Sequence, residues 1–159
     1  MVTENSPLAD KINMGLLIKL GTRDETAKTS GALHSIQTCY YKSFANTNET
    51  INYGMVQMSG GDFRMNFNRE SMWYQASCLA HDTVDIFNMM TDCALEPRNF
   101  NSAGVAFEKL PYSHKFKQTS KEWSPFTDTV MRAIFGASGL GMPVLGDPSN
   151  YKHLDAYTM

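Results

Sequence analysis

Two runs of alternating apolar and polar residues lie next to each other in the middle of the chain and constrain its fold most. In residues 62–69, Phe63, Met65 and Phe67 alternate with polar residues, which is the period of two expected of a half-buried strand. A second run, residues 72–79, follows after a short polar interval that predicts a hairpin turn. We therefore expect an antiparallel hairpin against which the helices of the chain pack.

The segments around this hairpin predict one further strand and four helices. Residues 14–20 form a short apolar run that ends at Gly21, and we expect them to be a buried strand. Apolar residues recur at helical spacing in four segments, which are residues 31–43, 51–59, 81–95 and 127–135. The order strand, two helices, hairpin and two helices indicates an α+β fold, with helices packed on one face of a mostly antiparallel sheet.

The sequence also predicts helix caps, core residues and loops. Thr29 or Ser30 is expected to cap the first helix. The apolar stripe of the third helix is expected to consist of Val84, Phe87, Met89, Met90 and Leu95. The aromatic and methionine residues expected in the core are Phe63, Met65, Phe67, Met72, Trp73, Tyr74, Met89 and Met90. Residues 136–148 predict a structured loop, residues 100–116 are ambiguous because Pro111 interrupts them, and residues 151–159 are compatible with one more helix.

The composition is that of an ordinary globular protein of one domain. The chain has 159 residues, 42% of them hydrophobic, and a formal net charge of −2. This balance argues against a nucleic-acid-binding or membrane-surface protein, and no apolar run approaches the roughly 18 residues that a membrane span needs. Because Cys39, Cys78 and Cys93 are an odd number without a CxxC pair, we expect free thiols in a reducing compartment.

The helix predicted to begin at residue 31 carries the arrangement closest to a metal site. His34 and Thr38 are four residues apart and share one helix face. Two histidines at that spacing, with a glutamate beside them, bind zinc and activate a water molecule. Here Gln37 stands in place of the glutamate and Thr38 in place of the second histidine. Because an amide does not take up a proton near neutral pH and threonine is a poor zinc ligand, the helix has the frame of a zinc site without its chemistry.

The remaining candidates for chemistry favour structural roles. The other histidines, which have no partner at ligand spacing, are His81, His114 and His153. Cys39 lies five residues after His34, which turns the two side chains to different sides of a helix and argues against a catalytic pair. The neighbouring acids Asp24 and Glu25 lie in a polar loop, where we expect a solvated or helix-capping role.

Five segments, taken in their order along the chain, match the pattern of a known family. They are residues 15–25, 31–34, 60–63, 69–77 and 140–146. The most specific is the run Arg-Glu-x-x-x-Tyr-Gln-Ala-Ser, from Arg69 to Ser77. Together they resemble the M16 (pitrilysin-type) metallopeptidases and, more narrowly, the alpha-type subunits of mitochondrial processing peptidases, which are closely related to the core subunits of the cytochrome bc1 complex. The resemblance covers roughly residues 2–157, the early part of a family subunit, and implies that residues 1–159 form a single, incomplete N-terminal-type domain of the LuxS/MPP-like fold.

The resemblance also indicates what the site has lost. Active members of the family carry an inverted zinc signature, His-x-x-Glu-His, and a glutamate further along the chain. The signature falls on His34, Gln37 and Thr38, so only its first histidine is present. The distal glutamate falls near Lys115, and Glu108 is out of register. Alpha-type subunits also lack this site, so the resemblance implies no catalytic residue, no metal and no cofactor. The glycine-rich loop with which they bind presequences lies beyond the matched region.

The function that the resemblance implies is that of a non-catalytic alpha-type M16 subunit. It would be a structural core component of respiratory complex III (bc1) or its supercomplex, on the matrix side of the mitochondrial inner membrane. The alternative is the alpha subunit of the mitochondrial processing peptidase, which assists a zinc-bearing beta subunit in recognising and cleaving presequences. A third hypothesis, a free-standing zinc peptidase, is disfavoured by the missing ligands.

The partners that the resemblance implies are protein subunits. They are an M16 beta-type partner, subunits of bc1 or its supercomplex, and a chain that supplies the rest of the domain. Neither nucleic acid nor a direct membrane span is expected.

Overall fold

The computed structural model describes residues 2–4, 10–40, 49–95, 124–147 and 149–150. In this part of the chain, three strands form one antiparallel sheet in the order β1-β3-β2. The strands are β1 (Lys11–Ile18), β2 (Asp62–Phe67) and β3 (Met72–Leu79). The sheet places the two strands of the predicted hairpin side by side and adds β1 on the far side of β3.

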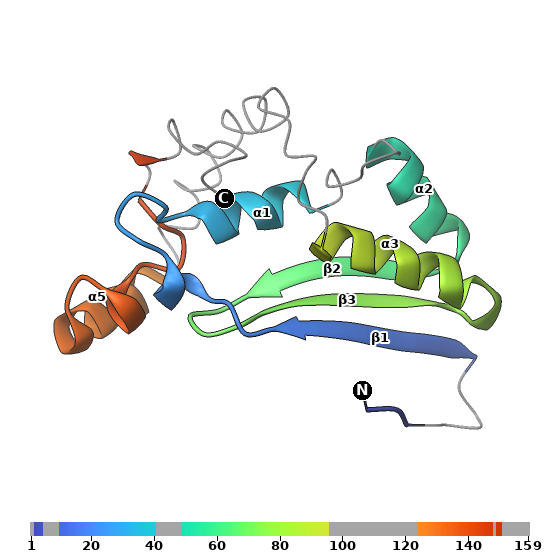
Figure 1. Cartoon of the computed structure of the whole chain (residues 1–159), viewed down its shortest axis with the longest axis horizontal. Coiled ribbons are helices and arrows are strands. Elements are labelled where there is room, and N and C mark those ends of the chain that lie inside the picture. Colours follow the sequence, from blue (N-terminus) through green and yellow to red (C-terminus); the bar gives the residue numbers. More distant parts are fainter. Residues whose placement is uncertain (1, 5–9, 41–48, 96–123, 148, 151–159) are drawn as a thin grey trace.

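The helices lie mainly over one face of this sheet (Figure 1). Those above the sheet are α1 (Ala32–Cys39), α2 (Glu49–Met58) and α3 (Thr83–Leu95), while α5 (Ser124–Phe135) lies beyond the end at which β2 turns into β3. The short 3-10 helices are η1 (Thr22–Asp24), η2 (Ala80–Asp82) and η4 (Gly139–Gly141). The predicted α+β fold, with helices on one face of an antiparallel sheet, is confirmed.

The hairpin turn is closed by an asparagine side chain. The Asn68 Oδ1 atom accepts hydrogen bonds from the backbone N–H groups of Glu70 and Ser71, each at 2.8 Å, and the Asn68 N–H donates to the Ser71 carbonyl at 2.8 Å. This local turn fixes the register in which Phe63 faces Ala76. The predicted turn is therefore confirmed, although the two-residue Asn-Gly signal is absent.

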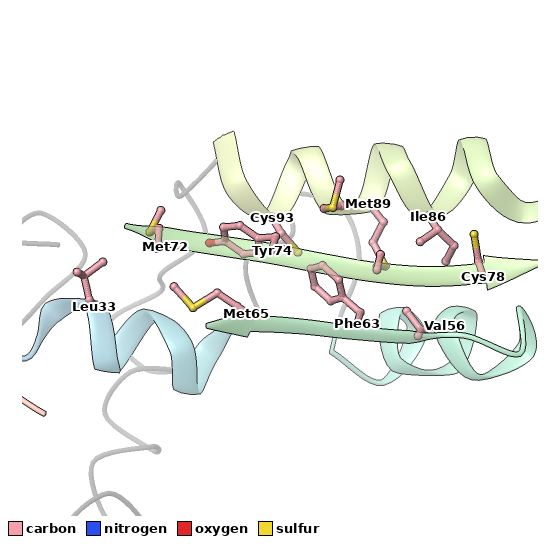
Figure 2. Close-up of a cluster of buried hydrophobic side chains, with 12 residues drawn as sticks. Leu33, Val56, Phe63, Met65, Met72, Tyr74, Cys78, Ile86, Met89 and Cys93 are labelled. Carbon is pink, nitrogen blue, oxygen red and sulfur yellow. The ribbon is translucent and has the colours of Figure 1, made fainter. Parts of the chain in front are cut away.

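The core lies between the hairpin and the helices that cover it. Its buried members are Leu33, Val56, Phe63, Met65, Met72, Tyr74, Ala76, Cys78, Ile86, Met89, Met90 and Cys93. In Figure 2 the side chains of Phe63 and Tyr74 lie between the hairpin and α3. Six of the eight expected core residues are buried, and Phe67 is partly buried against the core. Trp73 is half-exposed because it alternates with the buried residues Met72 and Tyr74 and so lies on the outer face of the sheet.

The burial expected for the first strand is wrong. β1 begins earlier than predicted, at Lys11, and alternates between exposed and half-buried residues. Only Met14, Leu16 and Ile18 pack against the core, whereas Leu17 is 65% exposed. Because β1 is the outermost strand of the described sheet and only one of its faces meets the helices, its apolar run is half-buried rather than buried.

The apolar stripe expected for α3 is also wrong in part. Met89 and Met90 are buried as expected, but the residues that complete the buried face are Ile86 and Cys93. Three predicted members are exposed instead, and these are Val84, Phe87 and Leu95. The helix is apolar on two sides, so the periodicity did not decide which side meets the sheet. Spacing of i, i+3, i+4 and i+7 from residue 86 matches the buried side.

A glutamate from the preceding loop caps the first helix, in place of Thr29 or Ser30. The N-cap residue of α1 is Gly31, which has a φ of 100° and no side chain with which to cap the helix. The carboxylate of Glu25 instead accepts the N–H of Gly31 at 3.0 Å and the N–H of Leu33 at 2.9 Å. Of the two roles expected for these acids, solvated or helix-capping, Glu25 has the capping role and fixes where α1 begins.

We expect the pH-dependent stabilisation by Glu25 to weaken as the pH rises. Burial raises the pKa of Glu25, and this effect exceeds the lowering by the N–H groups of Leu33, Gly31 and Ala32. The folded chain therefore holds this proton more tightly than the unfolded chain does. The resulting contribution to the free energy of unfolding is present below the ordinary pKa of 4.5 and is lost as the pH rises through the raised value.

Urea unfolding of the wild type and of Glu25→Gln, from about pH 4 to about pH 7, measures this effect. The free energy of unfolding of the wild type minus that of Glu25→Gln should decrease as the pH increases, because glutamine does not titrate. The exposed Glu70, replaced by glutamine, is the matched control. An increase of this difference with pH would contradict the assignment.

The rest of the chain agrees with the predictions where it is described. The helix predicted over residues 127–135 begins at Ser124, and the glycine-rich stretch after it contains η4 and turns. The predictions for residues 100–116 and 151–159 lie outside the described residues. Among the helices that the structure describes, none is long and apolar enough to cross a membrane.

Candidate functional site on helix α1

The predicted site lies on α1, which packs beside β2. His34 is almost entirely buried, with 6% of its surface exposed, and its ring lies 6.2 Å from that of Phe67 at the end of β2. The histidine thus lies in the interior and not on the surface. The imidazole is therefore part of the contact between helix and strand.

Gln37 connects the helix to the sheet. Its side-chain Nε2 donates a hydrogen bond to the backbone carbonyl of Met65 at 3.2 Å. One turn further along, the hydroxyl of Tyr40 donates to the carbonyl of Phe63, also at 3.2 Å. β2 is the outermost strand on this side of the described sheet, so carbonyls along its open edge need partners from outside the ladder. A side chain of α1 and that of its C-cap residue, Tyr40, thus satisfy alternate carbonyls of β2.

The structure does not bring a metal-binding cluster together in the part of the chain that it describes. No group of three or more histidine, cysteine, aspartate or glutamate side chains is placed there to hold a metal. Thr38 follows Gln37 within α1, and its place in the helix is all that is described. Lys115, Glu108, His114 and His153 lie outside the described residues.

The other candidates lie elsewhere in structural settings. The ring of His81 is exposed and its Nε2 lies 3.1 Å from the carboxylate of Asp82 in η2. Cys78 and Cys93 are buried free thiols, and burial raises the pKa of the Cys93 thiol. A thiol with a raised pKa is a poor nucleophile, which favours a packing role for Cys93.

An ion pair joins two segments that are distant in the sequence, and no local sequence pattern predicts it. Arg69, in the hairpin turn, pairs with Asp128 of α5, and the two side chains are only 16% and 18% exposed. Asp128 also accepts the N–H of Val144 at 3.5 Å. The pair fixes α5 to the end of the sheet. Its two residues are 59 positions apart in the sequence.

The chain belongs to the M16 peptidase family. The family model of the insulinase-type peptidases (peptidase family M16) matches residues 1–148. The resemblance inferred from the sequence motifs is therefore confirmed.

Several similar proteins are mitochondrial subunits. Core protein I of the ubiquinol-cytochrome-c reductase complex of Euglena gracilis is 24% identical over 150 residues, which are 94% of this chain and 30% of that protein. The mitochondrial-processing peptidase subunit beta of Blastocladiella emersonii is 23% identical over 158 residues, 97% of this chain and 33% of that protein. A probable alpha subunit from Schizosaccharomyces pombe is 27% identical over 85 residues, 54% of this chain and 17% of that protein.

The chain spans about a third or less of the length of these relatives, since it covers 30%, 33% and 17% of them. A solved structure, an inactive M16 peptidase domain from Pseudomonas fluorescens, has the same fold. The superposition has a TM-score of 0.82 at 12% identity and covers 96% of this chain and 37% of that one. This likeness shows the fold of an M16 domain.

Proposed function

We propose that the chain is a non-catalytic alpha-type M16 subunit and a structural core component of mitochondrial complex III (bc1) or its supercomplex. The observation that carries the proposal is the hydrogen bond from the Gln37 amide to the Met65 carbonyl. At the position where an active family member needs a proton acceptor, this chain has a donor that is engaged with the backbone.

The neighbouring positions support the same proposal. His34 is 6% exposed and packs against Phe67, so its ring lies in the interior rather than at a surface that substrate reaches. Thr38 lacks the imidazole that the second ligand position requires. These residues do not fit zinc, and no hydrolytic step is assigned to them.

The proposed location and partners rest on the relatives. Mitochondrial relatives include a bc1 core protein and subunits of the processing peptidase. These names support a mitochondrial subunit with an M16 beta-type subunit among its partners, and the matrix side of the inner membrane is the location that we propose for it. The alternative is an alpha subunit of the processing peptidase that assists presequence recognition, and the likeness to the S. pombe alpha subunit favours it.

Capture of the chain from mitochondria under mild detergent tests the choice between these assemblies. The proposal expects an M16 beta-type subunit together with cytochromes b and c1. Crosslinking of a presequence peptide to this chain, with a beta subunit but without cytochromes, would favour the alternative. Recovery of the chain without any M16 partner would contradict both.

Gln37 itself is expected to stabilise the fold. Replacing it with glutamate removes the amide donor and places a carboxylate against the Met65 carbonyl, so we expect a loss of about 1–3 kcal/mol in the free energy of unfolding. Gln75, which is exposed on the outer face of β3, is the control, and Gln75→Glu should change stability by less than about 0.5 kcal/mol. Equal effects in chemical denaturation would contradict a structural role for Gln37.

A further inference from the structure

A groove lies between α2 and the start of α3, away from the site on α1. These two segments lie side by side at the end of the sheet opposite α5 (Figure 1). The groove has a volume of about 630 Å³, and Ile51, Met55 and Met58 of α2 line one side of it. Asp85 and Ile86 of α3 line the other side, and Ile86 itself is completely buried.

Two of the apolar residues that α2 contributes to this groove are exposed. Met58 is 89% exposed and Ile51 is 55% exposed, although both belong to the same helix face as the half-buried Met55. Gly54 leaves further room, because no described atom lies within 4 Å of the place that a Cβ would take there. An exposed methionine beside an open helix face is typical of surfaces that adapt to an apolar partner.

Among the described residues that line the groove, the fixed charges are those of two aspartates. Asp82 and Asp85 line it together with His81, which pairs with Asp82, and the lining residues that the structure describes include no lysine or arginine. The nearby Lys11 does not line the groove, and its ammonium group donates to the carbonyl of Gly60 at 2.8 Å. An occupant with positive charge beside its apolar surface complements this arrangement.

We propose that the groove between α2 and α3 binds an amphipathic helix of a partner protein, with its apolar face on Met55 and Met58 and its lysines or arginines beside Asp82 and Asp85. A helix presents apolar anchors at i, i+3, i+4 and i+7, which suits a groove between two helices. The docking site is independent of the chemistry at α1 and assigns a binding surface to a subunit with a structural role.

Two synthetic peptides of about 15 residues test the proposal. Both carry leucines at i, i+3, i+4 and i+7; one has lysines beside them and the other has glutamates at the same positions. By fluorescence anisotropy, the basic peptide should bind the whole chain at least about tenfold more tightly than the acidic one, and salt should reduce this preference. Equal binding of the two peptides would overturn the proposal.

Variants locate the binding. Gly54→Leu fills the groove at a helix position with room for a side chain and should weaken binding of the basic peptide at least about tenfold. Met58→Lys changes a side chain that is 89% exposed, so this variant should fold even if Gly54→Leu does not. It should weaken binding of the basic peptide to a similar extent. Unchanged binding in either folded variant would contradict the assignment. So would a dimer of the wild type that Gly54→Leu dissociates, because a second copy would then be the occupant.

Discussion

Replacing Phe63 with alanine should lower the free energy of unfolding by about 3–5 kcal/mol. The side chain is completely buried at the centre of the core. Its ring lies 5.5 Å from that of Tyr40 in a tilted arrangement and 6.2 Å from that of Tyr74 in a stacked one. The smaller side chain removes these contacts and leaves a cavity that the hairpin and helices fill only in part.

The matched control for this substitution is Phe87→Ala on α3. Phe87 is 49% exposed and faces away from the sheet, so its loss should cost less than about 1 kcal/mol. Urea denaturation followed by circular dichroism compares the two variants directly. Similar losses would mean that the core does not lie between the hairpin and α3 as described.

Replacing Asp128 with alanine should be about as damaging, with a loss of about 3–5 kcal/mol, because it leaves the charge of Arg69 unpaired in a mostly buried place. The same substitution removes the acceptor of the Val144 N–H group. Since the pair joins the hairpin turn to α5, we also expect α5 to become easier to cleave by protease.

An exposed pair that involves the same turn is the control. Arg23 pairs with Glu70 at 2.8 Å, but these side chains are 46% and 64% exposed. Arg23→Ala should therefore cost less than about 1 kcal/mol. Replacing both Arg69 and Asp128 by apolar residues of similar size should recover much of the stability that the single change loses. A double variant as unstable as Asp128→Ala would contradict this explanation.

The sequence was most informative where the structure is local. A period of two along β2 and β3, with a short polar interval, was enough to predict the hairpin, because register and turn depend on neighbouring residues. Helical spacing likewise located α2 and α3. For α3 it did not identify the buried side, since Val84 and Phe87 on one side are as apolar as Ile86 and Met89 on the other.

Contacts between distant residues needed the structure. The sequence allowed a helix-capping role for Glu25, but it did not identify the bond to the N–H of Leu33, eight residues further along. Gln37 bonds a carbonyl 28 residues away, which no local pattern indicates. The substitution of Gln37 at a proton-acceptor position was visible in the sequence, but its bond to β2 required the structure. That bond gives the residue a structural role in addition to the loss of a chemical one.

Zinc stoichiometry is the most direct test of the claim that α1 supports the fold instead of hydrolysing peptides. After equilibration with zinc and removal of the free ion, metal analysis of the wild type and of His34→Ala should find far less than one zinc ion per chain in both. One tightly bound ion per wild-type chain, lost on His34→Ala while the variant remains folded, would contradict the account.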